Sequence, residues 1–427
     1  MKSAMKILLI TISILYSGVN WAQTQIRSSL DSLRLLRTNR MEEKAAERIN
    51  NYKHLSNKDS VTYLDLSYSH FTEIPEFVFE YKKLKTLDLS HNGIRKIDKR
   101  INDLQHLESL NLTDNGLSEH KIVFKKNNII KILYLSENDL EKLPWRAKRL
   151  DSLQEVIIKR NHFKDLPKRA KKHHQLTTLN VSENPLSLTG SYYHRLDHIT
   201  QLRLNKCNLS ELPQSLLQFK HLEQLQLAEN NIQAIPKYIN QFENLSGLVL
   251  YKNNIETLPK EFFDLKQLEE IDLYYNKIEV ISSHIKNLQQ LKILYLSHNQ
   301  IYSLPEEIGQ LKNLRRLYLH HNRLSSLPEA IMSLQKLEVL RINDNYFAEL
   351  PSPILALPSL NSLDIANNEI TVIPKALSEL PLMNFYFQEN PLDFNSIKNE
   401  HLEQTINKLS ERGAIVNPHS FETISTP

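Results

Sequence analysis

The sequence predicts an α/β solenoid, in which a short segment of chain is repeated and stacked to build one continuous core. Three observations support this fold class. A fixed pattern of apolar residues returns every 23 residues, and the 427-residue chain has room for many such repeats. It contains a single cysteine, so no disulfide within the chain can stand in for an apolar core.

The repeat is defined by the segment Leu87-Asp88-Leu89-Ser90-His91-Asn92-Gly93-Ile94, whose frame returns at residues 110–117, 133–140 and as far as 363–370. One position, the ladder position, recurs in steps of 23 residues with a last step of 22, which gives fifteen repeats over residues 61–392. The positions five and three before it and two after it are Leu, Ile, Val or Phe in every repeat. After Ser69 in the first repeat, the ladder residues are Asn92, Asn115, Asn138, Asn161, Asn184, Cys207, Asn230, Asn253, Asn276, Asn299, Asn322, Asn345, Asn368 and Asn390.

This frame resembles the leucine-rich-repeat family, whose pattern is LxxLxLxxNxL with one strand in each repeat. The segment that follows, as in SLPEEIGQL at residues 303–311, resembles the 23-residue LPxxI type. That type is found in bacterial exported proteins and in the intracellular Ras-group proteins of plants. The resemblance implies a curved horseshoe with a parallel sheet on its concave face.

The residues agree with this fold. Alternation around the strand sends leucines inward and the residues between them outward. An apolar residue lies five positions after the ladder position, and in ten repeats the next residue is Pro. Because Pro has a fixed φ and no N–H, it favours short helical or 3-10 segments on the convex side. Asp98, Lys121, Gly190 and Ser282 replace this Pro. Residues 120–128 and 185–198 are the least regular stretches, so we expect local distortions of the convex edge in these two stretches.

A buried side-chain amide at the ladder position can bond turn backbone groups that would otherwise lack partners. Cys207 occupies this position, where the family pattern accepts Cys. We therefore expect a buried structural residue there, and not a nucleophile.

Residues 1–22 are typical of a signal peptide, with Lys2 and Lys6 before a short apolar stretch and a cleavage point after Ala22. No cysteine follows this apolar stretch, so attachment as a lipoprotein is not expected.

Both ends of the repeat array are predicted to be capped. Residues 23–60 predict an N-terminal helical cap, with apolar residues at helical spacing at Ile26, Leu30, Leu33, Met41, Ala45 and Ile49. Residues 393–427 predict a second helix, ended by Gly413, and a loose tail from Asn417.

No catalytic machinery is visible. The seven glycines include no pair with P-loop spacing, and no Rossmann fingerprint or paired-cysteine metal motif is present. We expect no enzyme activity, no cofactor and no metal site. A net charge of +4 does not indicate nucleic acid, and no transmembrane span is expected. The oligomeric state is open.

An aromatic group is predicted on the concave face and its flanking turns, in the repeats of Asn253 to Asn322. Tyr is well suited to binding surfaces because it offers a large contact area and a polar tip. The alternative is that these rings only stack on their cross-strand neighbours. The predicted partner-binding residues are Tyr251, Tyr274, Tyr275, Tyr295, Tyr318, His298 and His320, with His321 beside them.

A second candidate surface is basic. It consists of Lys159, Arg160, Arg203 and Lys206, close to a cation-rich stretch between Lys142 and Lys172. It could bind an acidic glycan, lipid headgroup or acidic protein, or be an ordinary solvated surface. The sequence thus predicts an exported binding scaffold for a protein, with an acidic glycan as the other candidate partner. An intracellular signalling scaffold and a structural surface spacer remain alternatives.

Overall fold

The structure, a computed structural model, describes residues 32, 36, 38–118, 124, 129–143, 150–392 and 401–417. The expected signal peptide, the positions Ile26, Leu30 and Leu33, the irregular stretch around residues 119–128 apart from residue 124, and the tail after Asn417 lie outside these residues. The chain divides into two compact units, Met1–Asp139 with Pro144–Leu150, and Leu140–Leu143 with Asp151–Pro427. We call them the N-terminal and the C-terminal unit.

The N-terminal unit begins, within the described residues, with a helix over 38–54. Ala45 is buried, and the Arg48 guanidinium pairs with Asp65 at 3.1 Å and donates to the Ser67 carbonyl oxygen at 2.9 Å. These contacts hold the helix against the first repeat. Four parallel strands follow in chain order, with short 3-10 turns among them: η1 (Lys58–Ser60), β1 (Tyr63–Asp65), η2 (Glu76–Glu80), β2 (Thr86–Asp88), η3 (Lys99–Asp103), β3 (Ser109–Asn111) and β4 (Ile132–Tyr134).

The C-terminal unit is a parallel sheet of twelve strands in chain order, with one helix near its end. Its strands are β5 (Glu155–Ile157), β6 (Thr178–Asn180), β7 (Gln201–Arg203), β8 (Gln224–Gln226), β9 (Gly247–Val249), β10 (Glu270–Asp272), β11 (Ile293–Tyr295), β12 (Arg316–Tyr318), β13 (Val339–Arg341), β14 (Ser362–Asp364), β15 (Asn384–Tyr386) and β16 (Ile415–Asn417). Its 3-10 turns are η4 (Lys168–Lys172), η5 (Tyr193–Arg195), η6 (Gln214–Gln218), η7 (Lys237–Gln241), η8 (Lys260–Asp264), η9 (Ser283–Asn287), η10 (Glu306–Gln310), η11 (Glu329–Ser333), η12 (Ser352–Ala356) and η13 (Lys375–Glu379).

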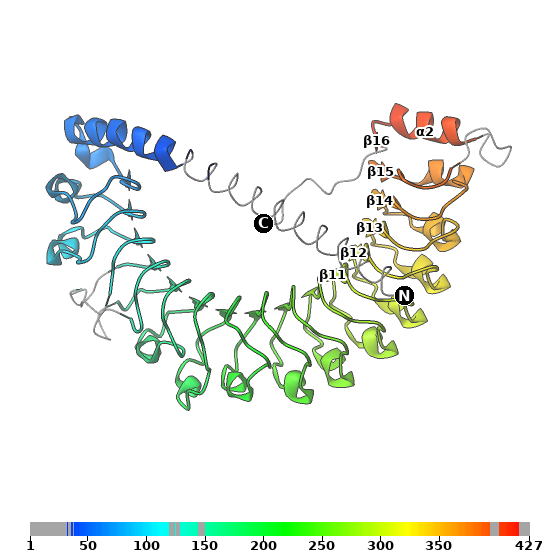
Figure 1. The fold of residues 1–427 in the computed structure, drawn as a ribbon, viewed down its shortest axis with the longest axis horizontal. Helices are drawn as coiled ribbons and strands as arrows, with labels where there is room; N and C mark the ends of the chain where they lie inside the picture. Colours follow the sequence, from blue (N-terminus) through cyan, green and yellow to red (C-terminus); the bar gives the residue numbers. More distant parts are fainter. Residues whose placement is uncertain are drawn as a thin grey trace, which may run out of the picture. The chain divides into compact units, whose positions relative to one another are not determined.

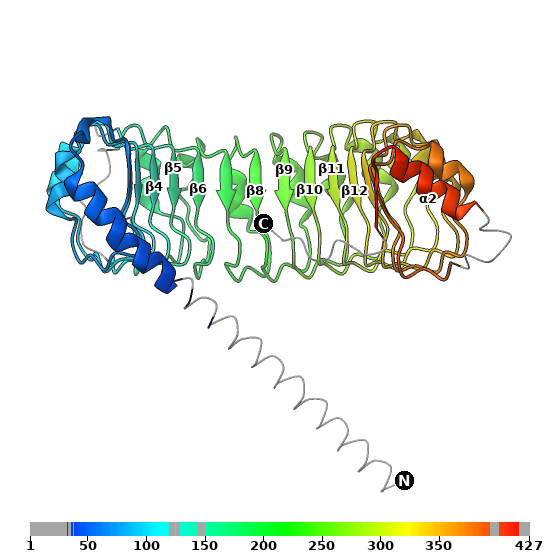
Figure 2. The ribbon, with the colours of Figure 1, turned by 90° about the horizontal axis from the view of Figure 1, so that it is seen from above.

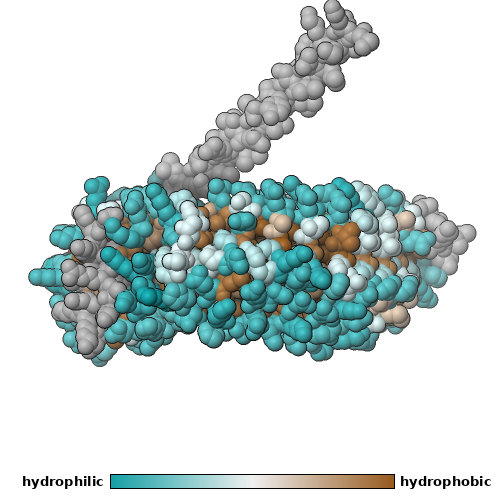
Figure 3. Space-filling view, turned by 90° about the horizontal axis from the view of Figure 1, so that it is seen from below, coloured by the Kyte–Doolittle hydropathy of each residue, from teal (hydrophilic) through white to brown (hydrophobic). Residues whose placement is uncertain are grey.

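Each strand of the C-terminal unit pairs in register with the next, so equivalent residues of successive repeats lie side by side. Leu248 pairs with Ile271 and Ile271 with Leu294, and all three are buried. Within this unit the strands line the inner side of a curved array and the 3-10 turns lie on its outer side (Figure 1), and the strands run side by side when seen from above (Figure 2). The outer side is mostly hydrophilic, with a broken apolar band along its middle (Figure 3).

The recurrent Pro caps the outer turns, as the sequence predicts for short 3-10 segments. Pro305 is extended (φ −77°, ψ 152°) and precedes η10, which closes with a bond from the Leu311 N–H to the Ile308 carbonyl oxygen at 3.1 Å. Where Pro is replaced by Asp98 or Ser282, the side chain accepts a hydrogen bond from the backbone N–H two residues on. These two repeats depart from the Pro pattern, and a side-chain cap keeps their turns regular.

The ladder amides join neighbouring repeats. Asn276 Oδ1 accepts from the Ile255 N–H of the preceding repeat at 3.0 Å. Its Nδ2 donates to the carbonyl oxygens of Leu250, also in the preceding repeat, and of Leu273, each at 3.0 Å. The same arrangement recurs at the other ladder asparagines, so the predicted role of this position is confirmed.

Cys207 is buried in the ladder, as predicted, but it cannot reproduce the amide. Its thiol contacts the carbonyl oxygens of Val181 and Asn205 at 3.5 and 3.4 Å, and offers no oxygen to the Leu186 N–H. That N–H bonds instead to the Asn184 carbonyl oxygen. Leu188 takes a φ of 49°, and the outer turn shrinks to the three residues of η5. The predicted irregularity of residues 185–198 is therefore confirmed, and the missing amide gives it a cause.

The C-terminal end carries the predicted second helix, α2 (Leu402–Glu411). Gly413 follows it with φ +87°, a conformation that suits glycine at the end of a helix. The predicted residues Phe394 and Ile397 lie outside the described residues. The chain then forms β16, which pairs with β15 and was not predicted. Asn417, expected to begin a loose tail, instead ends this strand.

Exchanging ladder residues should change stability in opposite directions. We expect Cys207→Asn to raise the free energy of unfolding by about 1 kcal/mol, because an amide would again bridge to Leu186. The reverse exchange, Asn276→Cys, should lower it by roughly 1–3 kcal/mol. Denaturant unfolding of both variants and the parent chain provides the measurement. A Cys207→Asn variant no more stable than the parent would show that the missing amide does not limit this turn.

Candidate functional site

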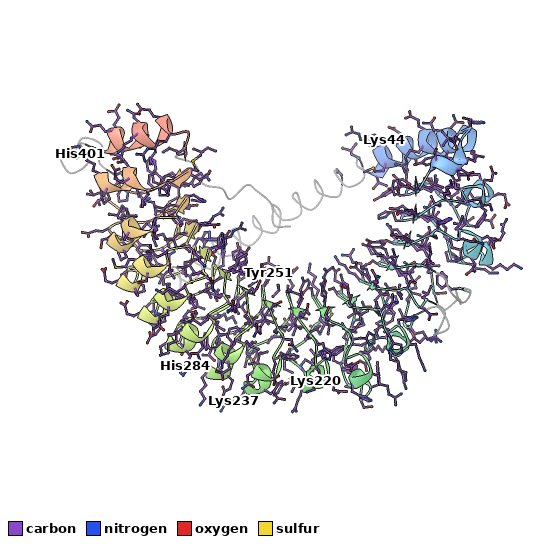
Figure 4. All side chains as sticks on the ribbon, turned by 180° about the vertical axis from the view of Figure 1, so that it is seen from behind. Lys44, Lys220, Lys237, Tyr251, His284 and His401 are labelled. Carbon is purple, nitrogen blue, oxygen red and sulfur yellow. The ribbon has the colours of Figure 1, made fainter. Side chains whose placement is uncertain are left out.

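The inner face of β9 to β12 carries the predicted tyrosines. Tyr295 ends β11 and pairs in register with Tyr318 at the end of β12. Tyr251 and Tyr274 lie two residues beyond β9 and β10, again on the inner face. Figure 4 shows Tyr251 on the inner side of the C-terminal unit and Lys237 and His284 on its outer side. The four rings are half-buried.

The tyrosines form two stacked pairs. The rings of Tyr295 and Tyr318 lie 4.7 Å apart and nearly parallel, at 9°. The Arg341 guanidinium lies 5.5 Å from the Tyr318 ring centre and extends this row. The rings of Tyr251 and Tyr274 lie 5.5 Å apart at 18°. Partial burial, followed by the neighbouring Tyr318, raises the pKa of Tyr295 to about 12, so its hydroxyl stays protonated at neutral pH.

A second column of rings runs beside the strands. In all fifteen repeats the residue just before the ladder position has a positive φ, although none of these residues is glycine. Tyr275, His298 and His321 occupy this position, and their ring centres are 4.0 Å apart at each step. Tyr274 joins this column to the strand face through edge-on contacts with Tyr275 at 4.6 Å and His298 at 4.8 Å.

His320 contacts Tyr274 on the strand face and His298 and His321 in the second column. Its Nδ1 is 2.7 Å from the hydroxyl of Ser297, which is fully buried. Burial, followed by His298, His321 and Arg341, lowers the pKa of His320 to about 3. The imidazole is therefore neutral at physiological pH, and its side chain is set by a hydrogen bond and not by an ion pair.

The structure brings together all seven predicted binding residues and adds two polar side chains that the sequence did not single out. Arg341 stacks on Tyr318. Asp272 lies in register beside Tyr295, and its Oδ1 accepts from the Tyr274 N–H at 3.0 Å. Burial raises the pKa of Asp272 to about 6, against the lowering effect of that bond. The sequence could have indicated both, because they occupy the same outward strand position as the tyrosines.

Comparisons with known proteins agree with this architecture. A family model described as a leucine-rich repeat region matches residues 275–383, and one described as leucine rich repeat matches residues 59–117 and 243–301. The structure of a leucine-rich-repeat protein from Leptospira interrogans is similar, with a TM-score of 0.65 and 26% identity over 86% of this chain and 98% of that one. The chain is a leucine-rich-repeat protein.

Two further solved structures are similar. An internalin from Listeria monocytogenes shares the fold, with a TM-score of 0.55 and 18% identity over 88% of this chain and 95% of that one. The ectodomain of the Arabidopsis thaliana receptor kinase GASSHO1/SCHENGEN3, in complex with CASPARIAN STRIP INTEGRITY FACTOR 2, has a TM-score of 0.52 and 26% identity. That match covers 74% of this chain and 43% of the receptor chain. A search of curated proteins gives no significant match.

The structure corrects the predicted basic surface of this leucine-rich-repeat protein. Lys159 and Arg160 both pair with Glu183, at 2.9 and 2.7 Å. Lys206 pairs with Glu229 at 3.0 Å, and Lys252 approaches the same carboxylate at 3.4 Å. Hydrogen bonds from Lys159 and Arg160 lower the pKa of Glu183, outweighing the opposite effect of its partial burial. Three of the four predicted cations therefore pair with a carboxylate along one edge, although Lys159 and Arg160 share one, while Arg203 ends β7.

Other chemistry is not apparent in the described parts of this leucine-rich-repeat protein. Burial raises the pKa of the Cys207 thiol to about 11, so the thiolate that a nucleophile needs is disfavoured. In the described ranges no three His, Cys, Asp or Glu side chains are grouped to hold a metal ion. None of the helices described there has the length and apolar character needed to span a bilayer.

His320 should make stability fall in mild acid. Its pKa is about 3 in the folded chain and 6.5 ordinarily, so the unfolded chain takes up the proton first. Its contribution is complete above about pH 6.5 and is lost as the pH falls. At pH 5 we expect a loss of roughly 1–2 kcal/mol relative to pH 7.5.

His320→Gln, which keeps a polar group near Ser297, should reduce this loss, whereas the exposed His221→Gln should behave like the parent chain. Urea unfolding of the three proteins at both pH values gives the comparison. It has to be made between variants because the raised pKa of Asp272 acts in the opposite direction below pH 6. If the parent chain and His320→Gln lose the same stability, His320 does not carry the effect.

Proposed function

We propose that this leucine-rich-repeat protein is a non-enzymatic binding scaffold that recognises a protein partner on its inner face. The observation that carries the proposal is the aromatic group of the inner face, made of Tyr251, Tyr274, Tyr275, Tyr295, Tyr318, His298 and His320. These rings come from four successive repeats: Tyr295 stacks on Tyr318, and the other five contact one another. Half-exposed tyrosines held rigid by stacking lose little conformational entropy when they bind.

The fold supports the same function. The leucine-rich-repeat fold suggests a protein–protein interaction scaffold, and proteins of this family are typically binding modules and not enzymes. The Arabidopsis ectodomain, 26% identical to this chain, is in complex with a factor. Because the aromatic group spans four repeats, the partner expected here is a protein that contacts several repeats at once.

The proposal includes export. The basic and apolar residues of positions 1–22 are typical of a signal peptide and would place the binding face outside the cytoplasm. An intracellular signalling scaffold, which the repeat type also resembles, requires that this segment is retained. A surface spacer requires no partner at all.

Loss of the central rings should abolish partner binding. In affinity capture from extracellular or envelope fractions, combined Tyr251→Ala, Tyr274→Ala, Tyr295→Ala and Tyr318→Ala changes should weaken binding of the captured protein at least tenfold. Tyr302→Ala with Tyr346→Ala removes two exposed tyrosines that lie away from the strands and should have little effect. Equal affinity of the four-residue variant and the parent chain would assign the rings a purely structural role.

Export makes a separate prediction. Mass spectrometry of the exported chain should show a start near Gln23, following cleavage after Ala22. A variant with Lys2→Glu and Lys6→Glu should be exported less well, because the basic start of the signal is lost. Recovery of an uncleaved chain from the cytoplasm only would favour the intracellular scaffold.

A further inference from the structure

The outer side of the C-terminal unit carries five Lys and Arg residues in two neighbouring turns, of which Arg169 donates to the Leu143 carbonyl oxygen. η4 has the sequence KRAKK, with Ala170 buried and Lys168 and Lys172 exposed. Lys171 is half-buried on the same turn, and the exposed Arg195 ends η5 in the next repeat. The two turns belong to consecutive repeats, and Arg195 lies close enough to Lys171 to act on its charge, so these side chains share one surface. We call Lys168, Lys171, Lys172 and Arg195 the outer basic cluster.

These cations lie close enough to influence one another. Partial desolvation, followed by Arg195, Lys168 and Lys172, lowers the pKa of Lys171, and no carboxylate contributes in the opposite direction. The nearby Asp165 accepts a hydrogen bond from the Tyr193 hydroxyl. Like charges held together without a counter-charge raise the local potential and attract anions.

The cations just beyond the strands differ from the outer basic cluster in having carboxylate partners. There Lys159, Arg160 and Lys206 each pair with a glutamate. In the described residues no carboxylate lies within 4.0 Å of any cation of the outer basic cluster. Three cations of the outer basic cluster belong to the cation-rich stretch between Lys142 and Lys172 that the sequence indicates, and the outer turns are the part of that stretch better suited to bind an anion.

The surroundings of the cluster favour one class of anion. Membrane-surface binding usually combines cations with exposed apolar side chains, and none of the large exposed apolar residues among those described falls between residues 150 and 200. Binding of nucleic acid strands commonly uses open aromatic rings, but the Lys168 ammonium lies over the Tyr192 ring at 5.7 Å. A polymer that carries repeated sulfate or carboxylate groups needs only spaced cations.

We propose that the outer basic cluster binds an anionic polysaccharide. The cluster lies on the outer turns, whereas the aromatic group lies on the inner strands, so this site is separate from the one proposed for a protein partner. A chain that binds polysaccharide on its outer side keeps its inner face free. The two interactions can therefore be tested separately.

The test uses heparin as a sulfated probe, polygalacturonate as a carboxylated probe and dextran as a neutral one. Affinity is measured with the full chain at about 50 mM and about 150 mM salt, since screening shortens the range of charge interactions. The variant Lys171→Gln with Arg195→Gln removes two cations of the cluster. The matched control, Lys237→Gln with Lys260→Gln, removes two exposed cations at the first positions of η7 and η8, with Lys237 on the outer side (Figure 4).

We expect binding to at least one charged polysaccharide and none to dextran. The cluster variant should bind about tenfold more weakly and with a salt dependence reduced by roughly two charges, as expected for released counterions. The control should stay within about twofold of the parent chain, and thermal unfolding should confirm that both variants fold. Equal weakening by the two variants, no polysaccharide binding at low salt, or binding only to vesicles containing phosphatidylglycerol or to polyglutamate would overturn the proposal.

Discussion

The bonds made by the ladder amides are the constraint on which the rest of the structure depends. Every repeat must turn away from its strand inside the array, and this leaves backbone groups that no strand or helix can satisfy. A single asparagine bonds its own turn and the turn before it, as Asn276 does with Ile255 and Leu250. Each repeat is therefore fixed to its neighbour by polar bonds as well as by the leucine core.

Where the ladder residue is not asparagine, the backbone changes. Among the described residues, the non-glycine positions with positive φ, other than those just before the ladder residue, are His70, Leu188 and Asn208. His70 and Asn208 directly follow Ser69 and Cys207, and Leu188 lies in the turn that the Cys207 side chain fails to bond. The side-chain amide at the ladder position thus accompanies the common backbone conformation of the turn, and positive φ values appear where it is missing.

Much of this could be predicted from the sequence, because the repeat is strict. The strands, the outer 3-10 turns, the ladder and the grouping of the inner tyrosines all follow from counting positions. The strand β16 was missed because Ile415–Asn417 carries no repeat frame and is placed only by pairing with β15. The ion pairs of Arg160 and Lys206 were missed because their partners lie one repeat further along, which a count of charges within one stretch does not reveal. The pKa of His320 depends on burial by neighbouring rings, and no local pattern gives that.

The column of residues just before the ladder has a consequence for how such a chain can change length. From Arg160 through Glu183, Lys206 and Glu229 to Lys252 its charges alternate in sign, so each cation pairs with an anion in a neighbouring repeat. Loss of one repeat by recombination between neighbouring copies would set Arg160 beside Lys206, or Glu183 beside Glu229. Loss of two would restore the alternation. In this stretch the array is therefore better suited to shrink or grow by pairs of repeats than by single ones, although all repeats share one length and one core.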